Sequence, residues 1–171
     1  VDRIEILAAG AGRRFTEAGY EESKPFLPVG NSFLGLQAMD ALGLPSHSKG
    51  ILLQKSQLNS TQHIELLKSN LIEIREVREL TKGQAESALI SLKSGSGGNC
   101  IVGTCDSLIF PDNKNLMLMR GKSIGVWVTK PSDFAINNPT QFGWVNLDDA
   151  GSISESWIKE EPSSPQEKYV I

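Results

Sequence analysis

The segment from Leu7 to Val29 holds the residues of this sequence best suited to bind a phosphate group. Its short turn Ala9-Gly10-Ala11-Gly12 directly follows the apolar run Arg3 to Ala8. A strand that ends in two glycines and leads into a helix exposes backbone N–H groups at the positive end of that helix, where an anion binds. Because Arg13, Arg14 and Lys24 follow closely, we expect cations around a bound phosphate. The glycines alone are equally compatible with a tight turn followed by solvated basic residues.

Two common nucleotide-binding motifs do not fit this segment. A dinucleotide fingerprint requires a third glycine where Phe15 stands, and an acidic residue near Gln54 at the end of the second predicted strand. The pattern G-x-x-x-x-G-K-[ST] occurs nowhere in the chain, which excludes a P-loop.

Short apolar segments alternate with helical patterns along the chain. We expect buried strands at residues 3–8, 50–54, 72–76, 100–104 and 123–129, helices around residues 61–71 and 84–93, and a hairpin formed by residues 142–147 and 153–159. This alternation predicts an α/β fold, a three-layer α/β/α Rossmann-like arrangement with a mostly parallel sheet and an antiparallel hairpin near the C-terminus. Asp106 follows the fourth predicted strand, at the edge where open α/β sheets collect ligands.

Composition narrows the functional classes. The chain has 171 residues, 17 Lys+Arg against 20 Asp+Glu, a net charge of −3 and a pI near 5.4, which argues against non-specific binding of nucleic acid. Cys100 and Cys105 suit a reducing interior. No apolar run approaches the length of a membrane span, and the acidic beginning of the chain is unlike a signal peptide. We therefore expect one domain over residues 1–171, a cytoplasmic location and no membrane partner.

Several motifs recur here in the order found in one known family. They are Leu7 to Phe15 (LAAGAGRRF), Lys24 to Val29 (KPFLPV), Thr81 to Glu86 (TKGQAE), Asp106, Phe142 to Val145 (FGWV) and Lys159 to Pro162 (KEEP). With them the sequence resembles the sugar nucleotidyltransferases, which join a nucleoside triphosphate to a sugar 1-phosphate and release pyrophosphate. The resemblance covers nearly the whole chain. Because family members are usually longer, it implies a chain that is incomplete at its C-terminal end.

The resemblance implies a role for each matched residue. Ala9, Gly10 and Gly12 would offer backbone amides to the triphosphate, Arg14 would stabilise the departing pyrophosphate, and Lys24 would lie between the attacking phosphate and the α-phosphorus. These roles suit phosphoryl-type transfer, which depends on positioning and charge neutralisation.

The remaining matched residues would bind metal, base and sugar. Asp106 would hold Mg²⁺, although an Asp that caps a turn with Ser107 is the structural alternative. Gly83 would leave space for the base, and Glu86 would either bond its edge or stabilise a helix N-terminus. Gly143 and Glu160 would contact the sugar.

One position departs from the family pattern, because Glu161 stands where the family carries a lysine that binds the sugar phosphate. The departure keeps two alternatives open, a nucleotidyltransferase acting on a non-sugar phosphate or phosphonate and a catalytically weak nucleotide-sugar-binding domain. The expected partners are a nucleoside triphosphate and a sugar 1-phosphate or similar phosphate, and a homo-oligomer is compatible with the sequence. The base and the acceptor are left open.

Overall fold

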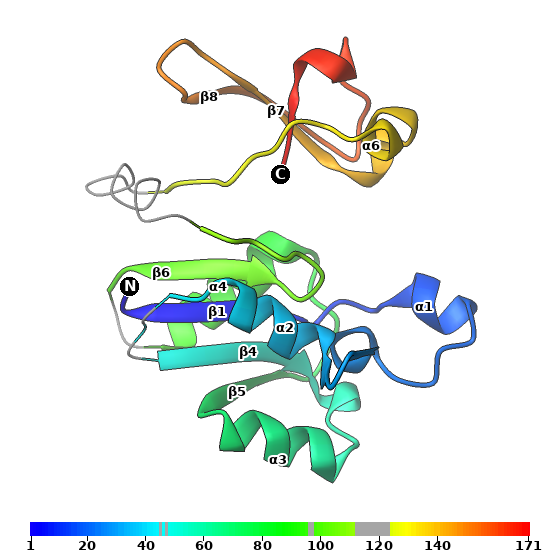
Figure 1. The fold of residues 1–171 in the computed structure, drawn as a ribbon, viewed down its shortest axis with the longest axis vertical. Coiled ribbons are helices and arrows are strands. Elements are labelled where there is room, and N and C mark those ends of the chain that lie inside the picture. Colours follow the sequence, from blue (N-terminus) through cyan, green and yellow to red (C-terminus); the bar gives the residue numbers. More distant parts are fainter. Residues whose placement is uncertain (45, 47, 96–97, 112–123) are drawn as a thin grey trace. The chain divides into compact units, whose positions relative to one another are not determined.

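A computed structural model describes residues 1–44, 46, 48–95, 98–111 and 124–171 of the chain. The chain forms two compact units, Val1–Asn113 and Lys114–Ile171, which are described separately (Figure 1). The expectation of a single domain stays a prediction. Among the described residues, no helix has both the length and the apolar character needed to cross a membrane.

A parallel sheet of four strands forms the centre of the first unit. Its strands are β1 (Arg3–Leu7), β4 (Ser48–Gln54), β5 (Ile72–Val77) and β6 (Cys100–Thr104), in the spatial order β5-β4-β1-β6. Strand β1 is buried along its whole length and pairs in parallel with β4 on one side and β6 on the other. Such near-continuous burial agrees with the branched apolar residues Ile4, Ile6 and Leu7 in this strand.

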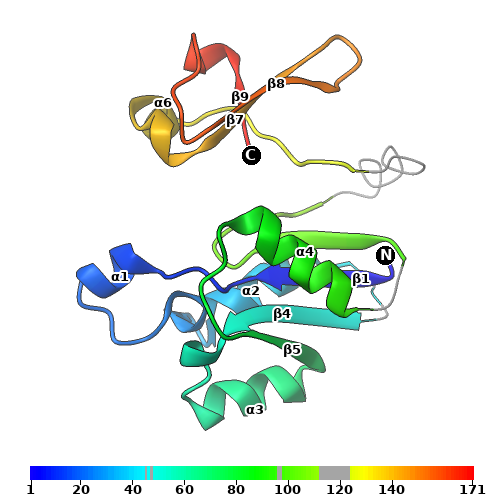
Figure 2. The same ribbon diagram turned by 180° about the vertical axis from the view of Figure 1, so that it is seen from behind.

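Helices cover both faces of this sheet. Helix α2 (Leu34–Ala41) lies in front of the sheet in Figure 1, whereas α4 (Gln84–Ser94) lies in front in the reverse view of Figure 2. Helix α3 (Thr61–Ser69) connects β4 to β5 and packs against β5. The expected three-layer α/β/α arrangement with a parallel sheet is therefore confirmed.

Short elements lie between β1 and α2 and after β4. They are α1 (Arg13–Glu17), the 3₁₀ turn η1 (Lys24–Phe26), the two-residue strands β2 (Pro28–Val29) and β3 (Ser32–Phe33), and the 3₁₀ turn η2 (Lys55–Gln57).

A charged network is buried under α4. Glu5, fully buried in the middle of β1, accepts hydrogen bonds from Arg75 of β5 at 2.9–3.1 Å and from the Ser91 hydroxyl of α4 at 2.6 Å. The hydrogen bond to Glu5 outweighs the effect of burial and raises the pKa of Arg75, so the guanidinium stays charged. Gly50 of β4 leaves the space for this carboxylate, since a Cβ there would overlap it. The network thus ties β1, β5 and α4 together.

The second unit contains a three-stranded antiparallel sheet. Strand β7 (Gly143–Leu147) pairs with β8 (Ile153–Ile158) on one side and β9 (Tyr169–Val170) on the other, which confirms the expected hairpin. The helix α6 (Asp133–Asn137) and the 3₁₀ turns η3 (Pro139–Gln141) and η4 (Pro165–Glu167) complete this unit.

The strand expected at residues 123–129 is wrong over its described part. Residues 124–128 form no strand, and Thr129 makes an isolated bridge to Val170. β-branched and apolar residues favour a strand only where a neighbouring strand is available for pairing. Residue 123 lies outside the described residues.

Candidate active site

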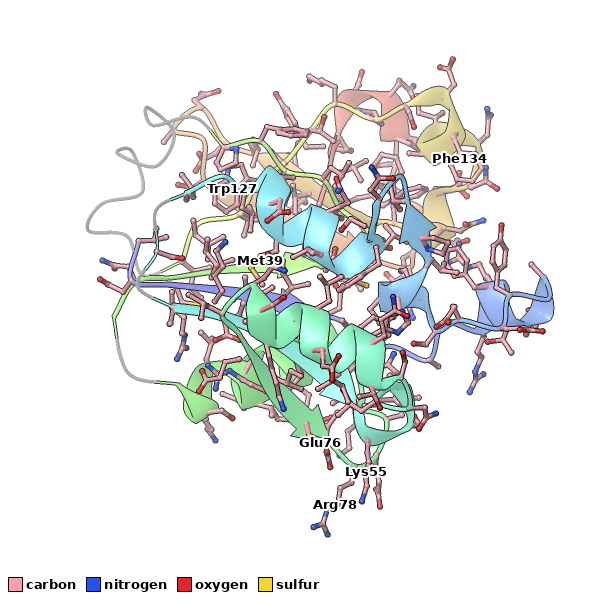
Figure 3. All side chains as sticks on the ribbon, turned by 60° about the horizontal axis from the view of Figure 1, so that its bottom comes forward. Met39, Lys55, Glu76, Arg78, Trp127 and Phe134 are labelled. Atoms are coloured by element: carbon pink, nitrogen blue, oxygen red, sulfur yellow. The ribbon has the colours of Figure 1, made fainter. Side chains whose placement is uncertain are left out.

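The loops that follow β1, β4 and β6 meet at the carboxyl edge of the parallel sheet. The Cys105 N–H after β6 donates to the Leu7 carbonyl at 3.3 Å, and the Ala8 N–H donates to the Leu52 carbonyl of β4 at 2.9 Å. Lys55 and Arg78, which directly follow the paired residues Gln54 and Val77, project at this edge (Figure 3).

The strand order reverses between β1 and β6. From β1 the chain passes through α2 to β4 on one side, and it later returns from β5 through α4 to β6 on the other. Open α/β sheets bind ligands in the crevice at such a reversal, outside the carboxyl ends of the strands. The loops after β1 and β6 therefore form the candidate active site.

The loop after β1 presents free backbone donors. Within the described part of the chain, no protein acceptor bonds the N–H groups of Ala9, Gly10, Ala11 or Gly12. Successive unpaired N–H groups form a concavity that binds anions. Because α1 has only five residues, the loop amides rather than a helix dipole provide this property.

Gly12 is required at its position for two reasons. Its φ of +61° is left-handed, and a Cβ there would lie 3.3 Å from the Cβ of Lys24. A larger residue would strain the backbone and push Lys24 away. Gly12 therefore allows the glycine loop and the Lys24 turn to approach each other.

Lys24 and Asp106 form an ion pair beside this loop. The Lys24 ammonium lies 2.5 Å from Asp106 Oδ2, and the two side chains are 23% and 48% exposed. Lys24 begins η1, whose next residues, Pro25 and Phe26, are buried, so its backbone is anchored. Its ammonium also lies 5.9 Å from the centre of the Phe15 ring. The structure thus brings two residues predicted to be functional into direct contact.

The surroundings of Asp106 keep its carboxylate charged. Burial raises the pKa of this carboxyl. The hydrogen bond from Lys24, the charge of Lys24 and a hydrogen bond from the Thr104 hydroxyl together lower the pKa by more than burial raises it, so the pKa lies below its ordinary value. The Thr104 hydroxyl donates to Ser107 Oγ at 2.9 Å. Asp106 therefore presents an ionised, half-exposed carboxylate at the switch point of the sheet.

These properties fit Mg²⁺. The ion prefers oxygen ligands and is usually held by one or two carboxylates together with substrate phosphates and water. The described residues contain no group of three or more His, Cys, Asp or Glu side chains able to hold a metal. A single carboxylate beside a loop of unpaired N–H groups suits a cation that arrives together with a phosphate.

Cys105 lies next to this pair but is unsuited to nucleophilic chemistry. Its side chain is buried, and burial raises the pKa of the thiol to about 11. Since the thiolate is the nucleophilic form, Cys105 stays inert near neutral pH.

The beginning of α4 holds Gly83 and Glu86. The Lys82 N–H donates to Glu86 Oε2 at 2.6 Å, and the Thr81 and Ser87 hydroxyls lie 2.7 Å apart. Glu86 thus stabilises the turn before α4, in agreement with the alternative that it stabilises a helix N-terminus. A Cβ at Gly83 would meet no atom within 4 Å, so there is open space beside this turn. Recognition of a base by Gly83 and Glu86 stays a prediction.

Comparison with known proteins gives matches among solved structures. No model of a protein family and no curated protein matches the sequence. The chain aligns over 98% of its length with 72% of a nucleoside-diphosphate-sugar pyrophosphorylase from Vibrio cholerae RC9, at a TM-score of 0.68 and 19% identity. It aligns over its full length with 70% of the inositol-1-phosphate CTP transferase from T. maritima (TM-score 0.74, 16% identity) and with 74% of a UDP-glucose pyrophosphorylase complexed with UDP-glucose (TM-score 0.69, 17% identity).

The fold is that of the sugar nucleotidyltransferases. At these identities the likeness concerns the fold, and it confirms the fold that the opening motif implied.

The other predicted residues belong to α1 and to the second unit. Arg13 and Arg14 are exposed on α1. Gly143 begins β7, and Glu160 is exposed just after β8, both in the second unit. Their roles stay predictions.

Two polar residues at the edge were missed as functional candidates. Gln54 stands out in the sequence only because a dinucleotide site would carry an acid there, and Gln57 belongs to no motif. Both side chains hydrogen-bond the glycine loop. Amide side chains directly after a predicted central strand were the available signal, because the carboxyl ends of parallel strands share one edge.

Proposed function

We propose that this chain is a nucleotidyltransferase that joins a nucleoside triphosphate to a sugar 1-phosphate, giving a nucleoside-diphosphate sugar and pyrophosphate. The observation that carries the proposal is the Lys24–Asp106 pair beside the free amides of the glycine loop, at the switch point of the sheet. This arrangement combines a cation, an ionised carboxylate and a loop of unpaired N–H groups in one place. The likeness of the fold to nucleotidyltransferases supports the same reaction.

The chain's own residues have distinct parts in this proposal. The amides of Ala9, Gly10 and Gly12 bind the triphosphate, while a phosphate oxygen of the acceptor attacks the α-phosphorus in line and pyrophosphate leaves. Lys24 neutralises the charge that builds on the α-phosphoryl oxygens, and Arg14 neutralises the charge of the leaving pyrophosphate. Preorganised cations of this kind lower the barrier because the charge develops in the transition state.

Asp106 is the residue proposed to hold Mg²⁺. The ion, when bound, supplies positive charge to the phosphate oxygens. Lys24 donates to one oxygen of the Asp106 carboxylate. Since an ammonium has three N–H donors, Lys24 can also donate to a phosphate oxygen.

The base and the acceptor would meet other parts of the chain. Gly83 and Glu86 are proposed to contact the base, and Gly143 and Glu160 the sugar. The exposed Glu161 would repel a sugar phosphate at the position where the family carries a lysine.

Glu161 therefore favours a second candidate, transfer of the nucleotidyl group to a non-sugar phosphate. One similar structure is that of an inositol-1-phosphate CTP transferase, whose acceptor by name is a polyol phosphate. A domain that binds nucleotide sugars with little turnover is the third candidate.

A pyrophosphate-release screen separates the candidates. Each common nucleoside triphosphate is combined with Mg²⁺ and a panel of sugar 1-phosphates and polyol phosphates. We expect one pair to release pyrophosphate with the wild-type chain and with Lys55→Met, which removes an exposed lysine at the same edge, but not with Lys24→Met. Release with a polyol phosphate alone would favour the second candidate. Nucleotide binding without release would favour the third, and absence of both would refute nucleotidyl transfer.

A further inference from the structure

Two glutamine side chains hold three successive carbonyls of the glycine loop. Gln54 Nε2 donates to the Ala9 carbonyl at 2.6 Å. Gln57 Nε2 donates to the Ala8 carbonyl at 3.1 Å and, over a longer 3.4 Å, to the Gly10 carbonyl.

The two glutamines also fix each other. The Gln54 N–H donates to Gln57 Oε1 at 2.7 Å, and the Gln54 side chain in turn accepts the backbone N–H of Gln57, which closes a capping box around η2. The Ser56 hydroxyl also donates to Gln54 Oε1 at 3.3 Å. Since both amide oxygens already accept hydrogen bonds, the NH₂ groups are the ends that face the loop.

These bonds determine where the loop amides point. In a trans peptide unit the C=O and N–H groups point in opposite directions. The two glutamines bond the carbonyls of residues 8, 9 and 10. The N–H groups in the same three peptide units, those of Ala9, Gly10 and Ala11, therefore point away from the glutamine side chains. These are the N–H groups that no acceptor within the described part of the chain bonds.

We propose that Gln54 and Gln57 are positioning residues that hold the glycine loop in its phosphate-binding geometry. They act through the loop and need not touch the phosphate themselves. An acidic residue at either position would lose the donor and place a negative charge behind a site for anions. The inference rests on the proposed function for the identity of the ligand, but the order of the loop can be measured without any ligand.

The test uses neutral variants of similar size. Gln57→Met and Gln54→Met remove the donors without adding charge, and Gln62→Met makes the same change at an exposed position of α3 as a control. The first readout is the backbone ¹⁵N order parameter of Gly10 and Gly12 in the ligand-free protein. We expect a fall from the rigid value of about 0.85 to below about 0.6 in the two loop variants and no change in the control.

The second readout is binding of tripolyphosphate, measured by calorimetry, beside binding of the parent nucleosides. Loss of one or two hydrogen bonds should weaken tripolyphosphate binding by about tenfold or more while leaving nucleoside binding unchanged. A general loss of structure would weaken both. If Gln57→Met fails to fold, Gln57→Glu keeps the acceptor for the Gln54 N–H and serves for the order-parameter measurement.

The outcomes separate the two proposals. Unchanged order parameters and unchanged tripolyphosphate affinity in the loop variants would overturn the inference while leaving the proposed function standing. A wild-type chain that binds no tripolyphosphate, but whose loop loses order in the variants, would support the positioning role and refute the proposed phosphate site.

Discussion

Replacing Lys24 by methionine should strengthen metal binding and weaken catalysis in the same protein. The Lys24 ammonium lies 2.5 Å from Oδ2 of Asp106, the carboxylate that is proposed to hold the metal. A divalent cation at this carboxylate therefore competes with the ammonium charge. Lys24→Met removes the competitor without changing the carboxylate.

The size of the effect follows from the geometry of the pair. Two unit charges about 4 Å apart interact by roughly 1 kcal/mol in water and roughly 4 kcal/mol at the surface of a protein. Because the Asp106 side chain is 48% exposed and the Lys24 side chain 23%, solvent screening favours the lower part of this range. About 1–2 kcal/mol corresponds to a roughly 5- to 30-fold tighter binding of the metal.

The assay is a titration with Mn²⁺, with the free ion followed by electron paramagnetic resonance in the absence of nucleotide. We expect tighter Mn²⁺ binding in Lys24→Met, unchanged binding in Lys55→Met and loss of binding in Asp106→Asn. The same Lys24→Met protein should lose roughly 10²- to 10³-fold in kcat, as on removal of an oxyanion donor.

Three results would refute this reasoning in different places. Equal Mn²⁺ affinity in wild type and Lys24→Met would show that the ion pair does not compete with metal. Retained Mn²⁺ binding in Asp106→Asn would show that Asp106 does not hold the metal. If Lys24→Met keeps the wild-type kcat and only raises KM, Lys24 does not act specifically on the transition state.

Three further predictions concern stability, reactivity and the acceptor. Arg75→Met removes one of the two guanidinium partners of the buried Glu5 carboxylate and leaves Arg3 and the Ser91 hydroxyl, so it should lower the free energy of unfolding in urea by about 3 kcal/mol; an equal loss in Arg78→Met, at an exposed position after β5, would argue against the network. Cys105, with a thiol pKa of about 11, should resist iodoacetamide at pH 8 in the native protein and react after unfolding, and rapid native labelling would contradict its burial. Glu161→Lys should raise the KM of the true acceptor if this carboxylate selects it; a lower KM would make the position a phosphate contact, and an unchanged KM would place Glu161 in solvent.

The layers of the fold and the position of the glycine loop can be predicted from the amino-acid sequence alone. Residues 3–8 and 50–54 predict buried strands because each is short and rich in branched apolar side chains, as a parallel strand covered on both faces requires. The turn Ala9 to Gly12 is equally local, since a φ of +61° at Gly12 favours glycine. Such features depend on neighbouring residues and are visible in the order of the chain.

Other features of the site depended on tertiary structure. Lys24 and Asp106 are 82 residues apart, and only the pairing of β1 with β6 puts their loops at the same edge. Gln57 is 49 residues from Ala8 in the chain, and in the sequence it resembles any polar surface residue. Only the pairing of β4 with β1 brings its amide to the Ala8 carbonyl. Residues 124–128 show the converse case, a strand-like pattern in which only the adjoining Thr129 pairs among the described residues.

The buried Glu5–Arg75 contact in the core also depends on tertiary structure. Glu5 and Arg75 are 70 residues apart in the chain, and each would be read as a solvated charge within its own strand. The register of the sheet and the packing of α4 decide that they meet in the interior. Local propensity and hydrophobic periodicity are properties of a segment, whereas the partner of a polar side chain is set by which strands become neighbours and in which register.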